Sequence, residues 1–206
     1  MLSKAKQRFA KPGQMTRDED ERAVGKPSQL AQNIEAHAEL LLQGTLLAID
    51  PSSGSAGSLP GYALFKGGRL VDAGTLELPR SGPLANRLFL LRDTLAKEFD
   101  RPDLLAVELI SPVMPSRKGI FLHKNSSSLI KAVGAVLSCW DCPVVEVAPV
   151  TWHSMTPPHY QKSDAADACA IGGACFITLA RVRGEPEPAM LMPSDLLTGV
   201  KDVSKA

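Results

Sequence analysis

Apolar and polar positions along the chain follow two periods, one typical of strands and one typical of helices. Residues 45–50, 103–110 and 143–150 are short, nearly all-apolar runs, as expected of strands buried on both faces of a sheet. Two further β-like runs, GYALFK and RLVDAGTLEL, flank Lys66-Gly67-Gly68-Arg69, which is a hairpin signal. The pattern therefore predicts five strands, of which the second and third form a hairpin.

Segments with apolar residues at helical spacing precede and separate these strands. They cover residues 28–43, 83–99, 126–140 and 164–183. Residues 148–163 are short and rich in proline, so we expect no helix between the last strand and the final helix. A hairpin followed by alternating strands and helices predicts an α/β fold, in which helices cover both faces of a mixed five-stranded sheet.

The two ends of the chain differ in composition from the middle. Residues 1–27 are charged throughout, which predicts a flexible N-terminal tail. Residues 184–206 contain prolines and have no clear period, which predicts a C-terminal surface tail. Residues 28–183, led by the helix at 28–43, then form a single domain.

The bulk composition narrows the class of protein. The 206 residues carry a net charge of +1, so any surface that binds nucleic acid must be a local patch. Four cysteines and no recognisable secretory signal predict a reducing, cytoplasmic setting. No apolar run reaches the roughly 18 residues that a membrane span needs, so we expect no membrane partner.

Four acidic residues stand at unusual positions. Asp50 ends the first buried strand, and Glu108 lies inside the apolar run LLAVELI near the end of another. Asp164 and Asp167 lie three residues apart on one face of an otherwise apolar helix, where two like charges repel. One interpretation is an ordinary helix start, because acidic residues interact favourably with the helix dipole there.

The other interpretation is that the four carboxylates converge. In open sheets with crossover helices, sites form at the carboxyl ends of adjacent strands, so Asp50 and Glu108 face each other if their strands are neighbours. The final helix then brings Asp164 and Asp167 over the same spot, and such a cluster requires cations. Oxygen ligands suit Mg²⁺ or Mn²⁺, and two ions about 4 Å apart would support phosphodiester hydrolysis.

Five stretches of the chain together form a recognisable pattern: LLAIDPSSGSAGSLPGYALF, AVELI, LIKAVGAVL, VVEVAPVTW and KSDAADACAI. This pattern resembles the RuvC-type Holliday-junction resolvases, including their phage relatives. The resemblance implies an RNase H-like fold and a Mg²⁺-dependent endonuclease that resolves four-way DNA junctions by paired nicks. It also implies branched DNA as substrate, a homodimer, no nucleotide cofactor, and the host cytoplasm if the chain is phage-encoded. By resemblance, Asp50, Glu108, Asp164 and Asp167 carry over as the catalytic, metal-binding carboxylates.

The segment after Glu108, LISPVMPSRKGIFLHKN, is longer than in the bacterial relatives. An apolar residue there opens the junction in the family, and Val113, Met114 or Phe121 are the candidates in this chain. His153 stands where phage relatives often place a lysine.

Basic residues near these acids are candidates for contact with the phosphate backbone, with solvated surface lysines and arginines as the alternative. The candidates are Arg117, Lys118, Lys124, Lys131 and Lys162. Cys139 and Cys142 have a spacing seen in zinc and redox sites, but no second pair accompanies them, so ordinary buried thiols are the simpler interpretation.

Three other functions stay open from the sequence. The first is a non-catalytic protein of the same fold that binds nucleic acid or directs assembly. The second is an ATP-binding protein of the actin and sugar-kinase fold, which requires two such lobes where this chain has one. The third is a related nuclease that acts on ribosomal-RNA precursors, in which we would not expect a glutamate within LLAVELI.

Overall fold

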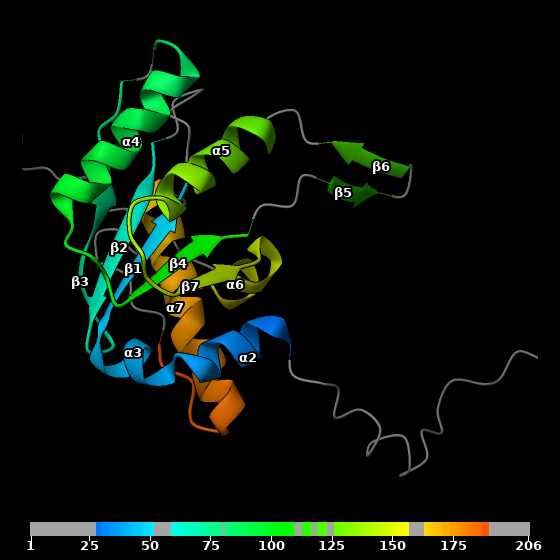
Figure 1. The fold of residues 1–206 in the computed structure, drawn as a ribbon. Helices are drawn as coiled ribbons and strands as arrows, with labels where there is room; N and C mark the ends of the chain where they lie inside the picture. Colours follow the sequence, from blue (N-terminus) through cyan, green and yellow to red (C-terminus); the bar gives the residue numbers. More distant parts are fainter. Residues whose placement is uncertain are drawn as a thin grey trace, which may run out of the picture.

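A mixed five-stranded sheet lies at the centre of the fold, in the strand order β3-β2-β1-β4-β7 (Figure 1). The computed structural model describes residues 28–51, 59–79, 81–109, 113–116, 119–122, 126–156 and 163–189. The strands are β1 (Thr45–Asp50), β2 (Gly61–Lys66), β3 (Arg69–Thr75), β4 (Leu104–Glu108) and β7 (Val144–Val147). β1 pairs antiparallel with β2 and parallel with β4, which confirms the predicted mixed sheet.

Helices cover both faces of this sheet, as the sequence predicts (Figure 1). They are α2 (Gln29–Ala36), α3 (Ala38–Gln43), α4 (Leu84–Glu98), α5 (Ser126–Leu137), α6 (Pro149–Met155) and α7 (Asp164–Arg183). One core cluster joins α2, α3, α6 and α7 to side chains such as Leu46 and Ala48. The other joins α4 and α5 to Leu47 and Ile49. Successive residues of β1 thus face opposite layers, which explains why the strand is apolar throughout.

The predicted hairpin between β2 and β3 is confirmed. Gly67 and Gly68 form its turn with φ of 54° and 72°, a backbone region that glycine enters without steric cost. Two positive φ angles in succession are what a two-residue hairpin turn requires, because they match the twist of the paired strands.

Three features of the secondary structure expected from the sequence were wrong. The leading helix is interrupted at His37, so it consists of α2 and α3. The segment expected to lack a helix contains α6, which begins with Pro149. Proline is favoured in the first turn of a helix because its missing N–H has no partner there in any case. A second hairpin, β5 (Val113–Ser116) with β6 (Gly119–Leu122), forms a separate two-stranded sheet that the sequence pattern did not predict (Figure 1).

The long helix α7 is the main partner of the sheet. Every residue from Ala168 to Ala180 is buried, and the side chains beneath it on the strands include Ala48, Ala63 and Ala106. Small residues on both surfaces let the helix approach the sheet closely. Among the described helices, α7 alone is long and apolar enough to cross a membrane, but 78% of its most apolar window is buried inside the fold. Core packing therefore accounts for its composition.

Gly172 marks the closest approach of α7 to the sheet. A Cβ at this position would overlap the Phe65 ring and lie 3.0 Å from the Cβ of Ala48. We expect Gly172→Ala to lower the free energy of unfolding by about 1–3 kcal/mol, because a buried, close-packed site cannot absorb a methyl group without shifts. Chemical denaturation measures this change.

Gly134 provides the matched control for that substitution. It lies inside α5, and a Cβ there would meet no atom within 4 Å. Gly134→Ala should leave stability unchanged or raise it by up to about 1 kcal/mol, because alanine is the better helix former. Equal effects of the two substitutions would contradict the close packing of α7.

Candidate active site

Two carboxylates stand side by side at the carboxyl ends of β1 and β4. The parallel register pairs Ile49 with Val107, so the next residues, Asp50 and Glu108, are neighbours. Residues 46 and 48 of β1 and residues 104 and 106 of β4 belong to the core on the α7 side of the sheet. By the same alternation, Asp50 and Glu108 point toward α7. Both are partly buried, and their side chains share a hydrogen bond.

The other two carboxylates come from the first turn of α7. Ser163 caps the helix, because its Oγ accepts a hydrogen bond from the N–H of Ala166 at 3.2 Å. Asp164 is the first helical residue, and its Oδ2 accepts a hydrogen bond from the N–H of Leu59 at 3.0 Å. The charges of Asp164 and Asp167 both act on Asp50. The four acidic residues selected from the sequence therefore meet at one end of the sheet.

This clustering changes where protons are held. Burial is the largest cause that raises the pKa of Asp50, and together with the charges of Glu108, Asp167 and Asp164 it brings this pKa to about 8. Burial also raises the pKa of Glu108, and Asp167 adds to the effect, whereas the hydrogen bond to Asp50 lowers it. A hydrogen bond between two carboxyl groups requires one proton, and the raised pKa of Asp50 favours Asp50 as the residue that carries it.

The chemistry of the donor set fits a divalent cation. In the described part of the chain, no group of three or more His, Cys, Asp or Glu side chains is spaced to hold a metal ion as it stands. The Asp50–Glu108 pair is instead held together by a proton, which a cation would have to displace. Clustered carboxylate oxygens are the ligands that Mg²⁺ and Mn²⁺ prefer, and positive charge would relieve their repulsion. The roles of the four residues as metal ligands and catalysts stay predictions.

The pair Cys139 and Cys142 does not provide a comparable set of metal ligands. Cys139 and Cys142 are free thiols, and burial raises the pKa of Cys139 to about 11. A metal-binding cysteine must lose its proton, so this environment favours the interpretation as ordinary thiols.

The predicted nucleic-acid contacts divide into two groups. Lys131 lies exposed on α5. Arg117, Lys118, Lys124 and Lys162 lie outside the described residues, as do the tail at 1–27 and residues 190–206. His153 is exposed on α6 and stacks on the buried Trp152, with ring centroids 3.7 Å apart.

Sequence reasoning missed the backbone that holds Asp164. The amide of Leu59 belongs to the short segment Leu59-Pro60-Gly61 that leads into β2. The visible signal was a glycine as the first residue of an alternating strand, because a glycine in a strand often marks the close approach of another backbone.

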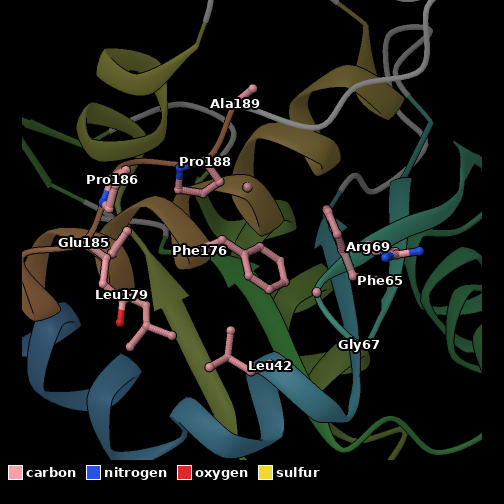
Figure 2. Close-up of a pocket in the computed structure, with 13 residues that line it drawn as sticks. Leu42, Phe65, Gly67, Arg69, Phe176, Leu179, Glu185, Pro186, Pro188 and Ala189 are labelled. Atoms are coloured by element: carbon pink, nitrogen blue, oxygen red, sulfur yellow. The ribbon is translucent and has the colours of Figure 1, made fainter.

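An apolar pocket lies beside the second half of α7, away from the carboxylates, and Figure 2 shows the residues that line it. Its volume is about 380 Å³, and it is lined by the β2–β3 turn, by α3, by the second half of α7 and by residues 185–189. Phe65 and Phe176 face each other in it with ring centroids 5.3 Å apart. None of the four carboxylates lines this pocket, so it is separate from the candidate active site.

Comparisons with known proteins show which fold this arrangement of strands, helices and carboxylates resembles. The fold is that of RuvC, an RNase H-like fold: "T. thermophilus RuvC in complex with Holliday junction substrate" superposes with a TM-score of 0.50 at 18% identity, over 66% of this chain and 94% of that one. A second structure of Thermus thermophilus RuvC gives a TM-score of 0.49 at 20% identity, over 70% and 99% of the two chains.

The sequence is similar to a RuvC as well. It is 36% identical over 115 residues to the crossover junction endodeoxyribonuclease RuvC of Halorhodospira halophila, which is 50% of this chain. The chain spans 60% of the length of that relative. No family model matches the chain. The predicted resemblance to the RuvC-type resolvases is thus confirmed by both sequence and fold.

The raised pKa of Asp50 predicts how stability depends on pH. In the unfolded chain this carboxyl titrates near 3.8, whereas in the folded protein it keeps its proton up to about pH 8. Between these values the folded state binds the extra proton, so stability falls as pH rises. Asp50→Asn mimics the protonated acid, and at pH 8.5 in EDTA we expect it to unfold with a free energy about 1–3 kcal/mol higher than wild type.

Denaturation at pH 5 is the internal control for this prediction. There the wild-type carboxyl is protonated in the fold, so the advantage of Asp50→Asn should shrink. A variant that is less stable than wild type at both pH values would rule out the proposed burial of the Asp50 charge.

Proposed function

We propose that this protein is a divalent-metal-dependent endonuclease that cuts four-way DNA junctions. The observation that carries the proposal is the meeting of Asp50, Glu108, Asp164 and Asp167 at one end of a RuvC-type sheet. The sequence similarity to a crossover junction endodeoxyribonuclease supports the same substrate class. A cluster of four acids on a stable scaffold is costly to fold, which favours a functional reason for it.

The chain's own groups have distinct tasks in this proposal. Divalent cations, Mg²⁺ with Mn²⁺ as a substitute and two per site, would supply Lewis-acid stabilisation of the attacking water and the departing 3′-oxygen. Asp50 would have to lose its proton to serve as an anionic ligand beside Glu108. Asp164 and Asp167 would add oxygen ligands from the helix side, and the Leu59 amide orients Asp164. No protein nucleophile takes part.

A homodimer would match the symmetry of the substrate. Paired nicks on two strands need two active sites related by a twofold axis. The layer formed by α4 and α5 exposes large apolar side chains, namely Phe89, Ile130 and Leu137. These residues support a second copy of the chain as the partner on that layer. Val136, on the same helix as Ile130 and Leu137, is buried in the core and is not available for such a contact.

The DNA would lie across the end of the sheet that carries the four carboxylates and would reach the exposed Lys131 on α5. Arg117, Lys118, Lys124 and Lys162 stay the proposed contacts on the remaining segments. A branched-DNA substrate agrees with the cytoplasmic setting expected from the sequence.

A cleavage assay on a mobile four-way junction tests this function. With Mg²⁺ or Mn²⁺ we expect paired, symmetric nicks that are absent on matched duplex. Asp50→Asn and Asp167→Asn should lower the rate by at least about 100-fold, because each removes an anionic ligand from the cluster. Asp72→Asn is the matched control, since Asp72 lies on the edge strand β3, accepts a hydrogen bond from Tyr62 and is not one of the four clustered carboxylates, so its loss should leave cleavage intact.

One outcome would favour the non-catalytic alternative. If the protein binds the junction but cuts nothing with either metal, the absence of a ready-made three-ligand group among the described residues becomes the relevant feature. The fold would then serve as a binding or assembly module.

Metal affinity should depend on pH in a defined direction. Below about pH 8 a cation competes with the Asp50 proton, so Mn²⁺ should bind about tenfold more tightly per unit increase in pH between 6 and 8. Calorimetry in buffers of different ionisation enthalpy should detect about one proton released per site at pH 7. Affinity that stays constant over this range would show that the cation displaces no proton from Asp50.

A further inference from the structure

The segment Leu59-Pro60-Gly61 touches both halves of the candidate active site. Gly61 pairs directly with Asp50 in the antiparallel register of β1 and β2. Leu59 donates its N–H to the Asp164 carboxylate, and the carbonyl of Pro60 accepts a hydrogen bond from the N–H of Leu76 at 2.8 Å. Three consecutive residues thus connect the strand that carries Asp50, the strand end at Leu76 and the helix that carries Asp164.

Gly61 sets the distance between these parts. A Cβ on this residue would overlap the carbonyl carbon and oxygen of Asp164 and would lie 3.0 Å from the N of Ala165. The obstacle is helix backbone, so no side-chain rotation relieves the overlap. Gly61 is buried, and the first turn of α7 lies against it. Any other residue at this position must move the first turn of α7 away from the sheet.

We propose that Gly61, together with the Leu59 amide, is the positioning element of the site: it fixes the first turn of α7, which carries Asp164, against the strand that carries Asp50, and so sets the geometry from which the four carboxylates would close on a cation. The consequence for metal binding rests on the proposed function, whereas the positioning itself does not. Gly61 touches no substrate and acts only through the placement of Asp164.

Gly61→Ala and Gly172→Ala form a matched pair for the test. Both add one methyl group between α7 and the sheet, but Gly61 lies at the carboxylate end and Gly172 lies over Phe65 and Ala48. Both should lower the melting temperature. Only Gly61→Ala should weaken Mn²⁺ binding, by about 10–100-fold as is typical when a group that orients a ligand is lost.

Leu59→Pro and Leu59→Ala provide a second pair in case Gly61→Ala fails to fold. Proline removes the N–H that Asp164 accepts from, while alanine keeps it. Leu59→Pro should therefore weaken Mn²⁺ binding and leave junction binding in EDTA unchanged, and Leu59→Ala should match wild type in both measurements.

Hydrogen exchange of the Leu59 amide in EDTA is a readout that does not involve metal or cleavage. The amide should be protected in wild type and in Gly172→Ala, and protection should fall by at least about tenfold in Gly61→Ala. Protection and Mn²⁺ affinity that both stay at the wild-type level in Gly61→Ala would overturn the inference. If protection is lost as expected but wild type itself binds no Mn²⁺, the positioning stands and the proposed nuclease function fails.

Discussion

The close packing of α7 against the sheet is the constraint on which the rest of this structure depends. The helix lies over β1, β2 and β4, where Ala48, Ala63 and Ala106 present small side chains to it. At Gly172 even one added methyl group would overlap the Phe65 ring. Dispersion forces and apolar burial are greatest when surfaces approach this closely. They hold α7, along its whole length, in one position on the sheet. That register decides where its first turn, and with it Asp164 and Asp167, meets the ends of β1 and β4.

The same packing brings like charges together at a cost to stability. Asp50 and Glu108 lie on the buried face of their strands because residues at period two along a strand share a face. Their pKa values rise because burial and neighbouring carboxylates both disfavour the ionised forms. A shared proton relieves part of this repulsion within the chain. The apolar core under α7 therefore supplies the stability that tolerates a destabilising cluster of carboxylates at one end of the sheet.

The two ends of α7 consequently differ in character. The first turn is capped by Ser163 and surrounded by carboxylates, whereas the last turn carries Arg181 and Arg183, which pair with Glu187 and Glu35. Basic residues at the helix end and acidic residues at its start both interact favourably with the helix dipole. The dipole thus favours acidic residues in the first turn, but it does not explain why this turn lies over Asp50 and Glu108. That placement comes from the sheet.

The sequence by itself determined the element types, the β2–β3 turn and the identity of the four acids. Those features follow from local rules: apolar periodicity, a glycine pair that accepts positive φ, and charges placed where burial makes them costly. It did not reveal α6, because proline usually breaks a helix, whereas Pro149 lies in the first turn, where proline is tolerated. Tertiary structure alone decided that β1 and β4 are neighbours, that Leu59 holds Asp164, and that Gly61 lies against the helix backbone. These contacts join residues more than 50 positions apart in the chain, and no local pattern records which distant backbone will fill the space beside a glycine.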